Sequence, residues 1–214
     1  MSGEQVLIFA GIGGQGIQVT AKTLARAAVY EQRRALYFSL FDGAQRGGVS
    51  DGAVAISDEP IQAPPLMKQP CDALLAMDPN GLKRYEMMMR PGSVLIYNRS
   101  IHEVSRFRYA DMHKEEVVDD ASPTRSDVDV LEIPATHLAN ERLNSPLMAT
   151  LICLGALIGK TGAVSLESAH RALRDSIRPG RHHMLQISED AITLGYKIGT
   201  GEESIEPPVA TSAT

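Results

Sequence analysis

The chain has 214 residues, enough for one α/β domain but not for two large independent ones, since domains usually span about 100–200 residues. Hydrophobic residues at 43% and charged residues at 22% are close to the averages of folded proteins and exclude a disordered, collagen-like or membrane-spanning chain. A net charge of −5 and an aromatic content of 5% without tryptophan provide neither the basic surface nor the stacking rings of a nucleic-acid binder. We therefore expect small molecules or proteins as partners, with no nucleic acid and no membrane.

The two cysteines, Cys71 and Cys153, stand in or beside apolar runs, and neither has a partner at the spacing of a metal or redox site. We predict two buried, reduced, structural thiols and a cytoplasmic protein. The N-terminus lacks the basic segment and long apolar core of an export signal, and no apolar stretch reaches the roughly 18–20 residues that cross a bilayer. We therefore expect neither export nor membrane insertion.

Short apolar runs alternate with helical periodicity from the start of the chain. Residues 5–10 predict a strand buried on both faces, residues 17–30 an amphipathic helix and residues 35–40 a second strand. Four glycines between residues 41 and 52 predict a loop. This order of strand, loop, helix and strand is typical of an α/β sheet.

The same alternation continues through the first hundred residues. We expect three more strands, at residues 52–57, 73–77 and 93–97. A helix is predicted to open at Asp78, with Pro79 in its first turn, and to end before Pro91 and Gly92. Its inward face is expected to carry Leu82, Tyr85, Met88 and Met89.

The second half of the sequence is mainly helical. Residues 102–127 are polar with a weak core pattern, and we interpret them as a surface excursion that precedes a strand at 128–133. Helices are predicted at residues 137–143, 147–158, 166–177 and 182–196. The helix at 147–158 is apolar almost all round and should therefore be buried.

Together these elements predict an α/β fold of the Rossmann-like, doubly wound kind, with a mostly parallel sheet and a helical C-terminal lobe. We predict a single domain over residues 1–199. Residues 200–214 contain Pro207, Pro208 and small polar residues, which predict a tail without stable structure.

The first glycine loop is the strongest local motif. Gly11, Gly13 and Gly16 have the G-x-G-x-x-G spacing, enclose Gly14 and Gln15, and stand between a predicted strand and a predicted helix. Such a loop binds phosphate through backbone N–H groups and the helix N-terminus, or it only packs the helix tightly on the strand. An acid at the end of the second strand, which holds the ribose in dinucleotide sites, is missing, and this argues against ordinary NAD binding.

A second glycine loop carries Arg46, Gly47 and Gly48 just past the carboxyl end of the second predicted strand, where open α/β sheets form ligand crevices. The Arg46 guanidinium can grip a phosphate or a carboxylate, or it can pair with an acid of this chain or a partner chain. The sequence is compatible with both roles of Arg46, ligand binding and pairing with an acid.

Catalytic and metal-binding patterns are missing from the local sequence. The histidines show no ligand spacing to one another, and there is neither a cysteine cluster for iron–sulfur ligation nor an arrangement for nucleophilic catalysis. We therefore predict no catalytic residue and no metal ion in this chain.

Five segments, in this order, resemble the gamma subunit of the 2-oxoacid:ferredoxin (acceptor) oxidoreductases, and the resemblance covers about residues 5–195. These segments are GIGGQGI at 11–17, RGG at 46–48, PGSVLIYN at 91–98, IPAT at 133–136 and LICLGALIG at 151–159.

The resemblance implies a noncatalytic subunit of a complex that converts a 2-oxoacid and coenzyme A to acyl-CoA and carbon dioxide. Companion subunits then hold thiamine diphosphate and a ferredoxin-like iron–sulfur part, with ferredoxin or NAD as acceptor. Coenzyme A is a substrate, and this chain alone holds no cofactor. The resemblance implicates the chain in coenzyme A binding, and we assign the contacts to the two glycine loops, at Gly11, Gly13, Gly14, Gln15, Gly16, Arg46, Gly47 and Gly48.

The second loop resembles the indolepyruvate type of this family more than the pyruvate type, and residues 77–84 are similar to a matching segment there. The resemblance therefore favours an aryl 2-oxoacid such as indolepyruvate or phenylglyoxylate. Two alternatives are a free-standing NAD-binding Rossmann dehydrogenase and a pure assembly module in which both glycine loops only pack.

Overall fold

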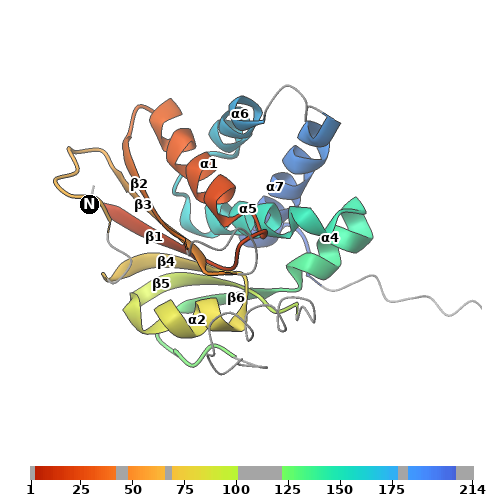
Figure 1. Ribbon diagram of the computed structural model, residues 1–214, viewed down its shortest axis with the longest axis horizontal. Helices are drawn as coiled ribbons and strands as arrows, with labels where there is room; N and C mark the ends of the chain where they lie inside the picture. Colours follow the sequence, from red (N-terminus) through yellow and green to blue (C-terminus); the bar gives the residue numbers. More distant parts are fainter. Residues whose placement is uncertain (1–2, 42–47, 66–68, 101–121, 178–182, 206–214) are drawn as a thin grey trace, which may run out of the picture.

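The computed structural model describes residues 3–41, 48–65, 69–100, 122–177 and 183–205. One six-stranded sheet in the order β2-β3-β1-β4-β5-β6 forms its centre. Helices α1, α5, α6 and α7 lie on one face of the sheet and α2 on the other (Figure 1). The prediction of an α/β fold with helices on both faces and a helical C-terminal lobe is confirmed.

The strands agree with the predicted ones to within a few residues. Their bounds are β1 Gln5–Ala10, β2 Arg34–Phe41, β3 Ser50–Ser57, β4 Cys71–Ala76, β5 Met89–Asn98 and β6 Asp129–Ile133. The pairs β1–β4, β4–β5 and β5–β6 are parallel, whereas β3 runs antiparallel to both β1 and β2. The sheet is therefore mixed, with β3 inserted between the first two strands of the chain.

The helices are α1 Ile17–Tyr30, α2 Pro79–Tyr85, α4 Ala135–Leu143, α5 Ala149–Thr161, α6 Leu166–Ser176 and α7 Leu185–Thr200. Helix α7 extends four residues past its predicted end, and residues 201–205 continue to make contacts. Glu203 pairs with Arg142 at 2.7 Å, and Ile205 packs against the core. The remainder of the predicted tail, residues 206–214, lies outside the described residues.

The predicted helix after Asp78 ends earlier than expected. Helix α2 stops at Tyr85, a 3₁₀ turn covers Glu86–Met88, and Met89 is the first residue of β5. Met89 pairs with Cys71 of β4, and the register then shifts before Val94. The placement of Met89 on the helix is therefore wrong, because pairing with β4 extends its backbone upstream of Pro91, while Met88 lies in the 3₁₀ turn rather than in α2. Both side chains still pack in the core, as predicted.

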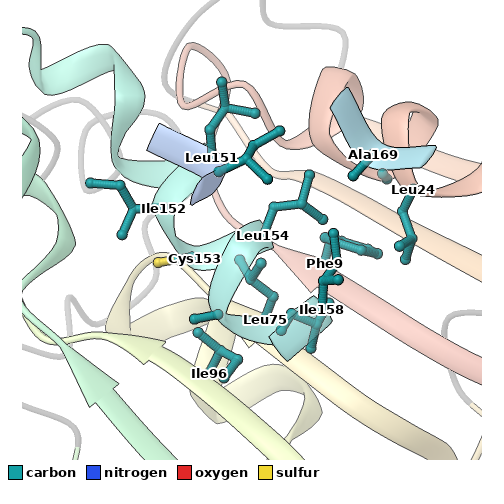
Figure 2. Packing of buried hydrophobic residues seen from close by; sticks show 14 of the residues in the cluster. Phe9, Leu24, Leu75, Ile96, Leu151, Ile152, Cys153, Leu154, Ile158 and Ala169 are labelled. Atoms are coloured by element: carbon teal, nitrogen blue, oxygen red, sulfur yellow. The ribbon is translucent and has the colours of Figure 1, made fainter. Parts of the chain in front are cut away.

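Helix α5 is the centre of the main hydrophobic core, as its sequence predicts. All ten residues from Ala149 to Ile158 are buried. Figure 2 shows Leu154 and Ile158 directed toward Phe9 and Leu75 of the sheet. The predicted burial of this segment is confirmed except at its start, where Leu147 is 65% exposed.

Glycines bring α5 and α7 into backbone contact. A Cβ atom at Gly195 would lie 1.9 Å from the carbonyl oxygen of Ile152, and one at Gly155 would lie 2.0 Å from the carbonyl oxygen of Ile192. Only glycine permits this approach at either position, so the two helices cross as closely as their backbones allow.

Among the described residues, no helix combines the length and the apolar character needed to cross a membrane.

Both cysteines are expected to be unreactive in the native chain. Cys71 and Cys153 are free and fully buried, and burial raises the pKa of the Cys71 thiol to about 12. The reactive thiolate is therefore scarce near pH 8. We expect no alkylation of the native protein by iodoacetamide at that pH and two alkylated cysteines after unfolding in guanidinium chloride, as counted by intact mass. Rapid labelling of either thiol in the folded chain would contradict this burial.

Candidate functional site

The first glycine loop links β1 to α1 and has a strongly bent backbone. Gly14 has φ +105° and Gly16, the N-cap of α1, has φ +84°. Residues with a Cβ atom rarely adopt these angles, which explains why glycine stands at both positions. The Gln15 side chain closes the loop by accepting a hydrogen bond from the Ile12 N–H at 2.9 Å. Thr150, at the start of α5, donates a further hydrogen bond to the Gln15 carbonyl oxygen.

The two glycine loops lie side by side where the structure describes both. The Gly13 N–H donates to the Gly48 carbonyl oxygen at 2.7 Å, and the Ser50 N–H donates to the Gly11 carbonyl oxygen at 3.0 Å. Gly13 is thus joined to Gly48, and Gly11 to Ser50, by hydrogen bonds rather than separated by an open crevice. Arg46 and Gly47 lie outside the described residues.

Open space lies instead beside Gly14, Gln15 and Gly16. They line a pocket of about 690 Å³, together with side chains from α1 and from the C-terminal lobe. Lys22 and Arg26 of α1 contribute positive charge to its wall, and Asp175 of α6 contributes one negative charge. Such a volume is typical of a site for a small organic ligand.

Within the described residues, the N–H groups of Gly14 and Gly16 donate to no protein atom. They stand at the N-terminus of α1, where the helix dipole favours an anion. The loop can therefore offer backbone donors to a phosphate group at the mouth of the pocket, while Gly11, Gly13 and Gly48 hold the loop in shape.

A buried charge cluster, which the sequence analysis missed, lies beneath this loop. Asp51 of β3 is fully buried, and its carboxylate accepts hydrogen bonds from the Gly11 N–H at 3.1 Å and from the Tyr85 hydroxyl at 2.7 Å. Arg84 of α2 binds the same carboxylate through Nε at 3.2 Å and Nη2 at 3.0 Å. Burial and the neighbouring Asp51 raise the pKa of Tyr85, so its hydroxyl stays protonated and donates.

The carboxyl end of β4 adds a second buried acid near the loop. Asp78 caps α2 by accepting a hydrogen bond from the Gly81 N–H at 2.9 Å through Oδ1. Its Oδ2 is buried without a hydrogen-bond partner among the described residues, and burial raises the pKa of this carboxyl. The strand ends of β1 and β4 lie next to each other, and the helices that follow them, α1 and α2, cover opposite faces of the sheet (Figure 1). Open α/β sheets bind ligands at such a point.

Over the described residues, no group of three or more histidine, cysteine or acidic side chains is placed to hold a metal ion. What the described site can offer is backbone donors and a partly apolar pocket whose wall carries two cations, Lys22 and Arg26, and one acid, Asp175.

A family model described as pyruvate ferredoxin/flavodoxin oxidoreductase matches residues 6–198. The chain is 30% identical over 189 residues to the 2-oxoglutarate synthase subunit KorC of Methanocaldococcus jannaschii, an alignment that covers 88% of this chain and 90% of that protein.

Two solved structures have the same fold. The gamma subunit of a keto/oxoacid ferredoxin oxidoreductase from Geobacter sulfurreducens has a TM-score of 0.68 at 22% identity, covering 92% of this chain and 99% of that one. The 2-oxoglutarate:ferredoxin oxidoreductase of Magnetococcus marinus has a TM-score of 0.75 at 17% identity, covering 97% of this chain and 33% of that one. This fold therefore occurs both as a separate subunit and within a longer chain.

The family model spans most of the sequence, and the relative from Methanocaldococcus aligns over nearly its whole length. The resemblance drawn from the five motifs is confirmed: the chain belongs to the pyruvate ferredoxin/flavodoxin oxidoreductase family.

Proposed function

We propose that the chain is the gamma subunit of a 2-oxoacid:ferredoxin oxidoreductase. The observation that carries this proposal is the family match over residues 6–198, supported by a similar length and fold in a gamma subunit from Geobacter sulfurreducens. The complex oxidises a 2-oxoacid in the presence of coenzyme A, giving acyl-CoA and carbon dioxide. Thiamine diphosphate and iron–sulfur clusters belong to companion subunits, and we place the assembly in the cytoplasm.

The electron acceptor in this proposal is ferredoxin, which the names of both solved relatives contain, whereas no name gives support to NAD. The Methanocaldococcus relative is named for 2-oxoglutarate, while the preference for an aryl 2-oxoacid is still a prediction, since residues 42–47 of the loop that suggested it are not described.

Coenzyme A binding by this chain is part of the proposal. The relative from Magnetococcus marinus was solved with 2-oxoglutarate, coenzyme A and succinyl-CoA bound. In this chain, Gly14 and Gly16 have N–H groups without a partner among the described residues, and they lie next to a pocket of about 690 Å³ whose wall carries Lys22, Arg26 and Asp175. Backbone donors and cations are suited to the phosphates of coenzyme A, and the apolar pocket wall is suited to its less polar parts.

Edge strand β2 supports a role in assembly. Leu36, Phe38 and Leu40 are 37%, 37% and 46% exposed and alternate along the strand, so they point to the same face of the sheet. An exposed apolar row on an edge strand marks a surface for another protein. The row therefore fits a subunit that packs against companions.

The proposal is tested by tagging the chain in its native host and purifying what it binds. We expect companion subunits that contain thiamine diphosphate and iron–sulfur clusters, and a preparation that forms acyl-CoA while reducing ferredoxin or a viologen dye. The tagged chain expressed alone should be colourless and inactive. Purification of the chain without companions, or turnover by the chain alone, would contradict the proposed function.

Replacement of Arg46 by alanine is expected to raise the KM for coenzyme A in the assembled complex. A charge-assisted hydrogen bond to a phosphate contributes about 1.5–3 kcal/mol, which corresponds to a rise of roughly tenfold or more. The KM for the 2-oxoacid should stay constant, because decarboxylation occurs in another subunit. An intact complex with an unchanged KM for coenzyme A removes Arg46 from the site, and loss of assembly supports the alternative in which Arg46 is an interface residue.

A further inference from the structure

We propose that Lys22 and Arg26 of α1 form a subsite for the 3′-phosphate of coenzyme A, so that the nucleotide end of the ligand occupies the pocket beside the first glycine loop. This inference rests on the proposed function, because it concerns the ligand assigned to that pocket. Both side chains line the pocket of about 690 Å³, and Gly14, Gln15 and Gly16 line it too. The two cations therefore face the same cavity as the backbone donors of the loop.

The chemistry of coenzyme A decides which end of it this chain can hold. The thiol is the reacting end, and in the proposed complex the reaction occurs in a companion subunit. The end left for this chain carries the adenine base, the diphosphate and the 3′-phosphate. All the negative charge of coenzyme A lies at this nucleotide end, whereas the pantetheine arm is neutral. A pocket that recognises charge therefore suits the nucleotide end.

The two cations stand one helical turn apart and are available to an anion. Both side chains are exposed, and neither forms an ion pair with another described residue. The Lys22 amine lies 5.4 Å from the centroid of the Tyr37 ring. Arg26 donates to the Ser176 hydroxyl at 3.0 Å, a neutral acceptor that leaves the guanidinium charge in place. A phosphate can therefore approach both cations without breaking an ion pair.

One acid, Asp175 of α6, belongs to the same pocket wall. It accepts a hydrogen bond from the hydroxyl of Tyr30, the last residue of α1, so it lies toward the end of that helix that is remote from the glycine loop. The Arg171 guanidinium lies 4.2 Å from the centroid of the Tyr30 ring and adds a cation there. We therefore expect Asp175 to weaken the contribution of Arg26 more than that of Lys22.

The spacing along α1 fits two anionic groups of one nucleotide. A helix rises 1.5 Å per residue, so Lys22 and Arg26 stand about 9 Å and 15 Å along the axis from Gly16. Helical side chains lean toward the N-terminus, which brings both cations closer to the loop. With the diphosphate at the Gly14 and Gly16 N–H groups, the 3′-phosphate is only a few bonds away on the same ribose, and Lys22 is the first cation within its reach.

Exposed aliphatic side chains provide a surface for the adenine base in the same pocket. Val19 and Leu147 both line the pocket, and each is more than half exposed. Exposed apolar side chains at a cavity are typical of a binding site for a ligand with an apolar face. The pocket thus combines cations with an apolar surface, which matches a nucleotide that combines phosphates with a flat base.

Dephospho-coenzyme A, which lacks only the 3′-phosphate, tests this contact separately from all others. In the reconstituted complex, the unchanged chain should give a KM for dephospho-coenzyme A about tenfold or more above that for coenzyme A. Lys22→Met should raise the KM for coenzyme A by about tenfold and leave that for dephospho-coenzyme A unchanged. Arg26→Met should have the same selective effect to a smaller extent. The kcat and the KM for the 2-oxoacid should stay constant.

Lys83→Met is the matched control. Lys83 is an exposed lysine of α2, which lies on the opposite face of the sheet from α1 (Figure 1). Its replacement removes the same charge, and the KM for both ligands should be unchanged. If Lys22→Met does not assemble, Arg26→Met and the preference of the unchanged complex for coenzyme A decide.

Three results would overturn the subsite. They are equal KM values for the two ligands in the unchanged complex, equal rises for both ligands in the Lys22→Met complex, and a preference for coenzyme A that is undiminished in both variants. In each case a raised KM in the Arg46→Ala complex still supports coenzyme A binding by this chain. If the variants of Lys22, Arg26 and Arg46 all leave the KM for coenzyme A unchanged, the proposed binding by this chain fails as well.

Discussion

Gly195→Val is expected to destabilise the chain by about 3 kcal/mol or more. Even the first added carbon would lie 1.9 Å from the Ile152 carbonyl oxygen, and that oxygen belongs to a helix backbone that cannot turn aside like a side chain. Helices α5 and α7 must move apart, which opens gaps around the buried residues of α5 and strains the core. The loss should be read from urea denaturation followed by circular dichroism.

The matched control for this substitution is Lys197→Val, which introduces the same side chain at an exposed position of the same helix. It should change the free energy of unfolding by less than about 0.5 kcal/mol. A Gly195→Val protein that unfolds at the same urea concentration as this control would show that the close crossing of α5 and α7 is not required.

Leu154→Asp should destabilise the fold by roughly 3 kcal/mol or more, because it places a carboxylate in the core without a partner. Leu154 is fully buried and is directed toward Phe9 and Leu75 (Figure 2). The control is Leu147→Asp, seven residues earlier, where the leucine is 65% exposed. Thermal melts should show a large fall in Tm for the first variant and a small one for the second. Equal melting temperatures for Leu154→Asp and the unchanged protein would mean that α5 is not the core helix.

How much of this structure is predictable differs from element to element. The segment at 147–158 has one interpretation, because a helix that is apolar on every side must be buried. Strand β3 is different: its short apolar run carries no information on direction, and its antiparallel insertion between β1 and β2 depends on contacts distant in the sequence. The helix that ends at Tyr85 instead of before Pro91 shows the same limit, since pairing of Met89 with β4 overrides local periodicity.

The candidate site is likewise predictable from the sequence only in part. The glycine spacing predicts a loop between strand and helix, and the structure places it there. The glycine pattern of residues 41–52 instead predicts that Asp51 lies in the second loop, and its partner Arg84 stands 33 residues away. The available signal was an acid at the start of an apolar strand, because a buried carboxylate needs a cation or several donors. Which cation it finds depends on the tertiary fold.

The most direct test of the proposed role of this chain is to rebuild the complex from its separate subunits with and without it. Ferredoxin reduction is measured with the 2-oxoacid as electron donor, as a function of coenzyme A concentration. We expect coenzyme A-dependent turnover only when this chain is present, in a stable assembly with the thiamine diphosphate and iron–sulfur subunits. Full turnover by the companion subunits, with the same KM for coenzyme A when this chain is left out, would contradict it.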